Sequence, residues 1–501
     1  MAAPVFQLHP EDGPPPEEAR NDTEVLPAPS APLDVARVLL EELHEEGQTT
    51  LRRWRGGWWR YQGPHWSEVE TEGVRKWLYL RLEKATYYAK TKDGELELKP
   101  WAPNRSKIDG VLDALAAPTL LPTEVEAPVW LHNGEPGAGY VPCANGLVDV
   151  NTRKLHPTTP RYFGTSSVPF DYDPDAGEPA EWLGFLRTLW PAHEDGTDAD
   201  EILALQEWFG YVLSGRMDLQ KILLVVGPPR SGKSTIARVL QGLMGKANVA
   251  HPTLASMATN FGLAPLLGRP LAIVGDARLQ SQGQETVVER LLSISGEDSL
   301  TVDRKNRDAW HGRIPSRIVI ISNELPRFGD ASGAIAARFV VLTLQESFLG
   351  REDVDLGDRL NAELAAILKW GLDGMTRLNA RKRFTEPAAS VEAVQALADL
   401  VSPISAFLRE VCVVDSEETV AVSKLYREYG EWCKENGRGV SSAQKLSSDL
   451  RTVLPKLSDY RPKVDGKNMP RHYRGLSVST EWATREKDNG REDEWKVGGW
   501  S

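Results

Sequence analysis

The chain has 501 residues, of which 41% are hydrophobic and 26% are charged, and this is the composition of a globular protein with about three domains. Its formal net charge of −12 argues against a protein coated in nucleic acid but leaves basic surfaces on single domains open. The three cysteines lie far apart, the N-terminus lacks a signal-peptide pattern, and no apolar run has membrane-spanning length. We therefore expect a cytoplasmic protein without a zinc site, a disulfide framework or a membrane partner.

The first part of the chain changes character near Leu33. Residues 1–33 contain eight prolines and few large apolar side chains, which predicts a disordered tail. Apolar residues at helical spacing then predict a helix from Leu33 to about Glu46. The run LRRWRGGWWRYQGPHW that follows fits either a stacking platform for single-stranded nucleic acid or a β-hairpin that turns at Gly56-Gly57. We favour the hairpin, because aromatic residues in strands are far more often core than ligand contacts.

The sequence predicts that an α+β domain occupies residues 34–180. Its pattern is mainly helical from Val74 to about Ala117 and then β-rich, with turn signals on both sides of a short strand, Leu147 to Val150. A loop with several prolines separates this domain from two helical stretches, residues 182–189 and 201–214. These helices lead into a further domain, which we place at residues 181–380. Its last part, Phe348 to Leu378, is predicted to form a lid of helices.

The ATPase domain is predicted from the stretch KILLVVGPPRSGKSTI. An apolar strand, residues 221–226, breaks into a loop that matches G-x-x-x-x-G-K-[ST], and an amphipathic helix follows from Ser234 to Leu243. Backbone N–H groups of such a loop wrap a phosphate chain, Lys233 reaches the β- and γ-phosphates, and the Ser234 hydroxyl binds Mg²⁺. The predicted cofactors are ATP and Mg²⁺, and the predicted ATP-binding residues are Gly227, Pro228, Pro229, Arg230, Ser231, Gly232, Lys233, Ser234 and Thr235.

Three later residues complete the predicted catalytic set. Asp276 follows a second apolar strand, where a carboxylate can coordinate Mg²⁺, although a surface turn is the alternative. Asn323 follows a third strand, residues 317–322, and its amide can hold the attacking water or sense the γ-phosphate. Arg338 precedes a fourth strand, where it either stabilises phosphoryl-transfer charge on a neighbouring subunit's nucleotide or is a surface residue.

Two basic segments are candidates for DNA contact. GEDSLTVDRKNR predicts a hairpin whose turn carries Arg304, Lys305 and Arg307, although a charged turn is usually only solvated. Three helical patterns between Val401 and Leu454 and a strand-like end, HYRGLSVS, predict a small winged-helix-like domain at residues 396–480. Eight basic and three acidic residues lie between Ser441 and Thr480, which favours nucleic acid as a partner. The candidates there are Lys445, Arg451, Lys463, Lys467, Arg471 and Arg474, and a disordered tail is expected at residues 481–501.

Several ordered motifs together resemble a known family. The matching stretches are ANGLVDVNTRKLHP, LQEWFGYVLSG, GPPRSGKST, SGEDSLTVDRKNR and IPSRIVIISNELPRFGDASGAIAARF. From about Asn145 to Leu378 the chain resembles the superfamily 3 helicase module at the C-terminal half of phage and plasmid primases and of poxvirus-type primase–helicases.

The resemblance implies an α/β fold with an AAA+-like P-loop core that assembles into a ring, usually a hexamer, and moves 3′ to 5′ along single-stranded DNA. It implies that Lys233 and Ser234 are the Walker A residues, Asp276 is Walker B, Asn323 is sensor 1 and Arg338 is the arginine finger. It also places the basic hairpin in the central pore. The family often has paired acids at Walker B, whereas this chain has Gly275-Asp276-Ala277. The catalytic base is therefore open, with Glu289 and Glu297 as possible substitutes.

The function expected from the sequence is an ATP-dependent DNA helicase that replicates a phage or related mobile element in the cytoplasm of its host. Its expected partners are forked and single-stranded DNA, further copies of the chain, and phage or host replication proteins. The alternatives are an ATP-switched initiator or loader that binds origin DNA, and the helicase part of a primase–helicase. Intrinsic primase activity would need metal-binding acids, and the only D-x-D candidates, such as Asp171 with Asp173, lie in Pro-rich or loop-like sequence. A small-molecule kinase is disfavoured, because it seldom needs Asn323 and Arg338 in this order.

Overall fold

The computed structural model describes residues 24–275, 277, 283–305, 307–326, 328, 334–464, 467–482 and 484. The residues form two compact units, of which the first ends at Gly137 and also includes Pro157–Thr165, while the second comprises Ala138–His156 and the chain from Ser166 onward. Residues 1–23 and 485–501 of the two expected tails lie outside the described residues. Among the described residues, no single helix has the length and apolar character needed to span a membrane. The helical segments Ala388–Leu400 and Pro403–Val411 reach that hydropathy only as a pair bent by 106°.

The first unit combines three helices with short antiparallel sheets. Its elements are α1 (Pro32–Glu41), β1 (His44–Glu45), β2 (Gln48–Thr49), β3 (Leu51–Trp54), β4 (Gly57–Tyr61), β5 (Trp66–Val69), α2 (Thr71–Leu82), β6 (Thr86–Lys90), β7 (Leu96–Pro100), α3 (Arg105–Thr119), β8 (Val129–Trp130) and β12 (Tyr162–Phe163). Strands β3, β4 and β5 form one sheet, and the three helices pack around a shared apolar core.

The tryptophan-rich run forms the predicted hairpin. Trp54, Trp58, Trp59 and Trp66 are all buried, so they build the core and leave no exposed stacking platform. The turn differs by one residue from the prediction, since Trp54 pairs with Gly57 and the two turn residues are Arg55 and Gly56, with φ of 47° and 75°. Two successive positive φ angles match the right-handed twist of the flanking strands, and an arginine takes one of them here.

Two parts of the first unit differ from the expected pattern. Residues 86–100 form the hairpin β6–β7 between two helices, where a mainly helical segment was predicted. Residues 24–26, expected to belong to the tail, pair with the start of β6, and Leu26 is buried. The hairpin was missed because Tyr88, Leu96 and Leu98 are exposed, so its apolar residues do not mark a buried face.

The second unit begins with a three-stranded antiparallel sheet and two helices. These are β9 (Tyr140–Cys143), β10 (Gly146–Asp149), β11 (Leu155–His156), α4 (Ala180–Leu189) and α5 (Asp200–Leu213). Strand β10 and helices α4 and α5 were predicted close to these positions. Nearly every residue of α5 is buried, which makes it a central helix of the unit.

A five-stranded parallel sheet forms the centre of the second unit, with the strand order β14-β15-β18-β13-β19. Its strands and their connections are β13 (Ile222–Val226), α6 (Lys233–Met244), η2 (Lys246–Asn248), β14 (Val249–Ala250), α7 (Leu254–Met257), η3 (Ala264–Leu266), β15 (Leu271–Val274), α8 (Gln284–Ser295), β16 (Leu300–Arg304), β17 (Arg307–Gly312), β18 (Arg317–Ser322), η4 (Ala336–Arg338) and β19 (Phe339–Thr343). The predicted α/β class is confirmed by this mixed α/β architecture and its parallel sheet.

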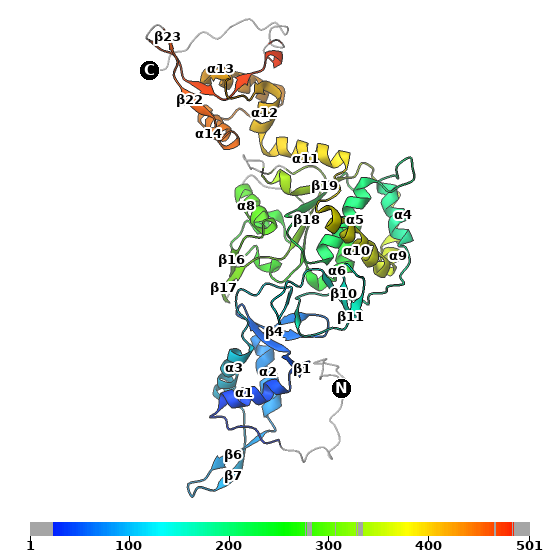
Figure 1. Ribbon diagram of the computed structural model, residues 1–501, viewed down its shortest axis with the longest axis vertical. Helices are drawn as coiled ribbons and strands as arrows, with labels where there is room; N and C mark the ends of the chain where they lie inside the picture. Colours follow the sequence, from blue (N-terminus) through cyan, green and yellow to red (C-terminus); the bar gives the residue numbers. More distant parts are fainter. Residues whose placement is uncertain are drawn as a thin grey trace. The chain divides into compact units, whose positions relative to one another are not determined.

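Helices cover both faces of the sheet, because alternate residues of each strand point to opposite sides. Leu223 and Val225 of β13 join one core with α4, α5, α6 and α10, whereas Ile222 and Leu224 join the other with α7, α8 and α11. Figure 1 shows α5, α6 and α10 on one side of the sheet and α8 on the other. Burial on both faces explains why these strands read as continuous apolar runs in the sequence.

Three more helices follow the sheet: α9 (Leu356–Ala362), α10 (Leu364–Arg381) and α11 (Ala388–Val401). Helix α10 lies directly against α5, and glycines make this approach possible, since a Cβ on Gly374 would lie 2.3 Å from the Gln206 carbonyl oxygen. Helix α11 packs on β19 and η4. Leu397 was assigned to the predicted C-terminal domain, which was expected to begin at residue 396, but the structure places it in the apolar core of the sheet.

The C-terminal part contains three helices and short strands. These are α12 (Pro403–Val411), β20 (Cys412–Val413), β21 (Thr419–Ala421), α13 (Val422–Glu435), α14 (Ala443–Val453), β22 (Ser458–Tyr460), β23 (Lys463–Val464), β24 (Lys467–Asn468), β25 (His472–Arg474) and β26 (Ser477–Val478). Strands β21, β25 and β22 form a sheet, and Phe407, Trp432 and Tyr473 are buried in a core of its own.

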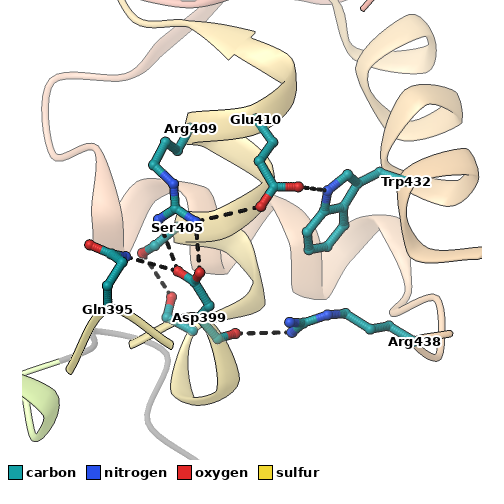
Figure 2. Close-up of polar contacts among 8 residues, drawn as sticks. Gln395, Asp399, Ser405, Arg409, Glu410, Trp432 and Arg438 are labelled. Carbon is teal, nitrogen blue, oxygen red and sulfur yellow. Dashed lines mark hydrogen bonds and ion pairs between the residues drawn. The ribbon is translucent and has the colours of Figure 1, made fainter. Parts of the chain in front are cut away.

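A polar cluster ties α11 to this C-terminal part (Figure 2). Arg409 of α12 donates to both carboxylate oxygens of Asp399 at 2.9 and 2.7 Å, and Arg438 donates to the Asp399 backbone carbonyl at 3.0 Å. Glu410 accepts a bond from the Trp432 indole at 2.8 Å. We refer to the Asp399–Arg409–Arg438 contacts as the clasp.

Candidate functional site

The predicted phosphate loop connects the carboxyl end of β13 to the start of α6. The Gly227 N–H donates to the Ser322 carbonyl at 3.2 Å, and a Cβ on Gly227 would lie 2.7 Å from Leu344. Arg230 and Gly232 take left-handed backbone angles, with φ of 61° and 93°. Glycine is therefore needed for close packing at position 227 and for backbone conformation at position 232.

Lys233 is the first residue of α6 and is buried. Its ammonium donates to the carbonyl oxygens of Gly227 and Pro228, both at 2.6 Å, and to Ser231 Oγ at 3.2 Å. Burial lowers the pKa of Lys233, because the loop supplies neutral oxygens to a desolvated charge. The adjacent Ser234 is exposed in the first turn of α6. An anion at this helix N-terminus would meet the ammonium, the helix dipole and free N–H groups together.

A cavity of about 680 Å³ lies against the phosphate loop. This volume falls within the range of about 300–1,000 Å³ that is usual for small-molecule sites. Three segments line it: helix α4, the loop with the start of α6, and residues 347–359. The lining residues are Ala180, Glu181, Gly184, Phe185, Thr188, Arg230, Ser231, Gly232, Lys233, Ser234, Thr235, Arg238, Phe348, Arg351, Glu352, Asp353, Val354, Leu356, Gly357 and Arg359.

Residues 347–355, which we call the strap, are bound to the back of the phosphate loop. The Phe348 N–H donates to the Arg230 carbonyl at 2.9 Å, and Ser347 Oγ donates to the Pro229 carbonyl at 2.8 Å. The guanidinium of Arg351 lies 5.5 Å from the centre of the Phe348 ring. The strap therefore fixes the loop backbone from one side and contributes cavity wall from the other.

Ion pairs join the strap to the helices on either side of the cavity. Arg359 of α9 donates to Glu181 of α4 at 2.9 Å and to Asp353 of the strap at 2.7 Å. Glu363 accepts bonds from the first N–H groups of α4, those of Glu181 and Trp182, at 3.0 and 2.9 Å. A carboxylate at a helix N-terminus satisfies donors that have no partner within the helix. These contacts give the cavity a defined polar wall.

Asn323 lies at the same edge of the sheet as the phosphate loop. It follows β18, whose last residue, Ser322, is paired in register with Val226 at the end of β13. Asn323 is exposed there. Parallel strands end at one edge, so the structure brings the predicted sensor beside the loop. Asp276 lies outside the described residues, two positions after β15, which ends at this edge too.

Arg338 lies at the opposite edge of the same sheet. Phe339, which follows it, pairs with Ile222 at the beginning of β13, whereas the phosphate loop follows the end of that strand. Five strand residues separate the two positions, or roughly 16 Å at about 3.3 Å per residue. Arg338 is half-buried and donates to Gln220 Oε1. The structure therefore does not bring Arg338 and Lys233 together within one chain.

The two substitutes for the catalytic base differ in position. Glu297 lies at the Arg338 edge, because Gln220 donates to the carbonyl of the preceding Gly296 at 3.4 Å. Its carboxylate pairs with Arg313 at 3.6 Å. Glu289 is exposed on α8, the helix that follows β15. Glu297 is thus separated from the phosphate loop of its own chain, and the geometry favours neither residue as a partner of Lys233.

The basic hairpin forms as predicted. Strands β16 and β17 pair antiparallel, and Val302 and Trp310 are buried at its base in the core of the sheet. Arg304 donates to the Asp308 carbonyl at 3.0 Å, so this guanidinium is bent back onto the hairpin. Lys305 is exposed in the turn. Arg307 opens the return strand, and the structure does not describe its side chain.

The basic candidates of the C-terminal part occupy different surroundings. Arg451 and Arg471 both pair with Asp459, whereas Lys445 pairs with Asp449 on its own helix at 3.0 Å. Arg474 lies over the Tyr460 ring, 4.8 Å from its centre. Lys463 and Lys467 lie in the small hairpin β23–β24, of which only the Lys463 side chain is described, as exposed. Arg451 and Arg471 line a cavity of about 650 Å³.

The candidate primase acids do not form a metal site in the described part of the chain. Asp171 and Asp173 are exposed on either side of the buried Tyr172, whose backbone is held by Asn145 at 2.9 Å. No group of three His, Cys, Asp or Glu side chains suited to a metal ion occurs among the described residues. The bound Mg²⁺ expected from the sequence would rest on Ser234 and Asp276, of which only Ser234 is described.

Sequence reasoning missed the cavity walls outside the phosphate loop. Phe185 of α4 packs over Gly232, where an added Cβ would lie 3.0 Å from its ring. Arg351, Asp353 and Arg359 come from a stretch that was predicted only as part of a helical lid. The available signal was the charged run REDVDLGDR, residues 351–359, after the last buried strand, which ends at Thr343.

Three family models match separate parts of the chain. They are "D5 N terminal like" over residues 36–191, "Family of unknown function (DUF5906)" over residues 225–338, and "Poxvirus D5 protein-like" over residues 402–492. The chain therefore resembles primase–helicases of the phage and poxvirus type. The resemblance predicted from the motifs is confirmed by these matches, which extend it to the N-terminal and C-terminal regions.

Solved structures are similar to this chain over most of its length. The structure described as "The A form apo structure of NrS-1 C terminal region-CTR" matches with a TM-score of 0.50 at 12% identity, over 89% of this chain and 100% of that one. "The apo structure of NrS-1 C terminal region (305-718)" has a TM-score of 0.48 at 11% identity, over 89% and 99% of the two chains. At this identity the first match shows a shared mixed α/β fold.

Proposed function

We propose that this primase–helicase relative is an ATP-dependent DNA helicase that acts in the replication of a phage or related mobile element. The supporting observation is the separation of the phosphate loop and Arg338 to opposite edges of one parallel sheet. One chain supplies a nucleotide cavity without the arginine, and the same chain carries the arginine where a second copy can meet it. A head-to-tail ring places the two edges against each other, and we expect such a ring, usually of six copies.

The residues around the cavity fit ATP. The phosphate loop lines the cavity, Lys233 lies at the N-terminus of α6, and the cavity continues between α4 and the strap. When bound, Mg²⁺ on Ser234 and Asp276 would neutralise charge on the phosphates. Lys233 then exchanges its loop oxygens for phosphate oxygens, Asn323 orients water at the sheet edge, and Arg338 of the next copy stabilises transition-state charge.

The remaining predicted parts fit the same proposal. We interpret the five-stranded sheet as an AAA+-like core and the C-terminal part as a winged-helix-like domain. Lys305 at the hairpin turn, with Arg304 and Arg307 beside it, would bind DNA phosphates without sequence preference, as translocation along a single strand requires. We expect 3′ to 5′ movement by the family resemblance, in the cytoplasm of the host cell with phage or host replication proteins as further partners.

Subunit mixing tests the shared site directly. Lys233→Ala and Arg338→Ala should each abolish ATP hydrolysis and unwinding of a 3′-tailed fork. In a 1:1 mixture, roughly one quarter of head-to-tail interfaces combine an intact loop with an intact arginine, so hydrolysis should return to about that fraction. A mixture that stays inactive, although both variants assemble with native subunits, would contradict the shared site.

Substitution in the hairpin turn distinguishes the role of the hairpin in unwinding from nucleotide binding at the cavity. Lys305→Ala should lose unwinding and the stimulation of ATP hydrolysis by DNA, while its nucleotide affinity stays native. Lys92→Ala is the matched control, because Lys92 is an exposed lysine in the turn of another hairpin, β6–β7. If the native protein hydrolyses ATP on DNA and binds duplex in an ATP-dependent way but never separates strands, the initiator or loader function replaces the helicase.

A further inference from the structure

The cavity of the C-terminal part lies between the starts of α13 and α14 and strand β25. Its lining residues are Val422, Ala443, Gln444, Ser447, Ser448, Arg451, Thr452, Arg471 and Tyr473. The lining contains two guanidiniums, four hydroxyls and an amide, and none of the lining residues is acidic. All three classes of group donate hydrogen bonds to anionic oxygens. The chemistry of the wall therefore matches a phosphate-bearing ligand.

A single carboxylate holds the two arginines of this wall together. Asp459 on β22 accepts from Arg451 at 2.7 Å through one oxygen and from Arg471 at 2.8 Å through the other. The Arg471 guanidinium also lies 6.0 Å from the centre of the buried Tyr473 ring. Each guanidinium has five N–H donors in a planar fork, so one bond to Asp459 leaves most of them available. The trio carries a net charge of +1 and two oriented forks.

The exposed face of α14 lies beside this arginine pair. Gln444, Ser448 and Thr452 are exposed and follow one another at intervals of four residues, so they line one face of the helix. Their side chains are short and polar, which allows the helix to approach another surface closely. The aromatic residue of the wall, Tyr473, is 2% exposed. Unpaired bases therefore find no ring on which to stack within this wall.

We propose that this surface is a docking site for double-stranded DNA, with the Gln444–Ser448–Thr452 face of α14 in the major groove and the Arg451–Arg471 pair on two backbone phosphates. A helix fits the major groove of B-form DNA, and arginine forks bind phosphate oxygens in a bidentate manner. Phosphate contacts fix the position of a helix in the groove, and hydroxyl and amide groups contact base edges. Asp459 acts as a positioning residue that keeps the forks in place before DNA arrives.

This assignment separates four of the six basic candidates of the C-terminal part. Arg451 and Arg471 belong to the site, whereas Lys445, bound to Asp449, and Arg474, over Tyr460, lie outside its lining. The site adds a duplex contact to the proposed motor and needs neither ATP hydrolysis nor the basic hairpin. A helicase with such a site would hold the duplex ahead of the strand on which it moves.

Duplex binding by the full-length chain without nucleotide tests this site. The probes are a labelled 30-base-pair duplex and a single strand of the same length, titrated at several salt concentrations. The Arg451→Ala/Arg471→Ala double variant should lose duplex affinity about 10-fold or more. The slope of log Kobs against log salt concentration should become less steep by about 1.8, or about 0.9 for each lost phosphate contact. Lys434→Ala, which removes an exposed lysine of α13 paired with Glu431, should bind as the native chain does.

Two more variants separate positioning from charge and from folding. Asp459→Asn removes a negative charge and so raises the net charge of the domain by one. An effect of charge alone predicts tighter duplex binding, whereas loss of arginine positioning predicts weaker duplex binding. Arg451→Lys/Arg471→Lys keeps the charge but removes the forks, and it should bind duplex more weakly than the native chain even if the alanine variant fails to fold.

The outcomes for the site and for the motor are distinct. Native duplex affinity and salt dependence in the folded double variants would overturn the site, and equal losses on duplex and single strand would overturn its assignment to double-stranded DNA. Tighter binding by Asp459→Asn would overturn the positioning role. ATP hydrolysis by the C-terminal variants should stay native. Failure of the helicase proposal would instead be seen as absent unwinding by the native chain, which does not affect these comparisons of duplex binding.

Discussion

The two edges of the central sheet carry opposite halves of one expected site. The carboxyl edge has a cavity of about 680 Å³, a buried lysine at a helix N-terminus and the exposed Asn323. The amino edge has Arg338, bound to Gln220 and to no part of that cavity. A stand-alone nucleotide enzyme gathers its charged groups around one pocket, whereas this chain divides them. This division is what the proposed ring requires, since in such a ring a second copy would complete the chemistry.

Hydrolysis and binding should respond differently at the two edges. Lys233→Ala removes the ammonium that meets the phosphates, so both nucleotide affinity and hydrolysis should be lost. Arg338→Ala should lower kcat by about 10³-fold or more, with nucleotide affinity close to native, because the arginine acts on transition-state charge. A fluorescent nucleotide titration and a steady-state ATPase assay measure the two effects. A weakened nucleotide affinity for Arg338→Ala equal to that of Lys233→Ala would end the distinction between the edges.

A buried carboxylate joins the helix pair α5–α10, which packs on one face of the central sheet. Glu207 is fully buried and accepts from Arg377 at 2.7 Å and from the Thr385 N–H at 2.6 Å. Glu207→Ala should destabilise the protein by about 3–5 kcal/mol, because it leaves an arginine without its partner. Urea unfolding measures this change. The control is Asp198→Ala, which removes a partly exposed partner of Arg187 and should cost less than about 1 kcal/mol. Equal costs for both variants would contradict the role of burial.

Glycine contacts make the same helix pair sensitive to added volume. A Cβ at Gly374 would lie 2.3 Å from the Gln206 carbonyl oxygen, so Gly374→Ala should force the helices apart and cost about 1–3 kcal/mol. Gly430→Ala in α13 is the matched control, because no atom lies within 4 Å of its added Cβ. That substitution should stabilise the helix by up to about 1 kcal/mol. Thermal unfolding of both variants compares them, and a neutral Gly374→Ala would show that the helices are not in tight contact.

The phosphate loop could be predicted because its chemistry is local. Gly227, Gly232 and Lys233 act within seven residues, and the strand before them and the helix after them confirm the motif. The parallel sheet was also predictable, since strands buried on both faces are continuous apolar runs. The cavity walls were not, because α4 and the strap meet the loop from positions far away in the sequence. Long-range packing of this kind leaves no motif.

Elements with exposed apolar residues also escaped prediction. The hairpin β6–β7 carries an Asp93-Gly94 turn, which is the signal that was overlooked, with φ of 85° at Gly94. Helix α11 follows Pro387 and packs its apolar stripe on β19. The basic residues that begin at Arg381 read as a linker, so the ATPase domain was predicted to end at residue 380, before this helix. The opposite locations of Lys233 and Arg338 depend on the register between strands, which cannot be predicted from a single sequence.

The clasp offers the smallest effect and concerns the edge that carries Arg338. Helix α11 packs on η4, whose last residue is Arg338, and Arg409 and Arg438 bind its end at Asp399 (Figure 2). The Arg409 and Asp399 side chains are 45% and 22% exposed, so water competes for the pair. A double-mutant cycle with Asp399→Ala and Arg409→Ala should give a coupling energy of about 0.5–1 kcal/mol.

Because α11 is held on the sheet by Leu397 and its apolar neighbours, loss of the clasp should leave the position of η4 unchanged. ATP hydrolysis by Asp399→Ala should then stay within about 2-fold of native, in contrast to the loss expected for Arg338→Ala. Leu397→Ala removes the apolar anchor and should cost about 2–5 kcal/mol of stability. A large loss of hydrolysis in the folded Asp399→Ala variant would show that the C-terminal part, and not the sheet alone, sets the position of Arg338.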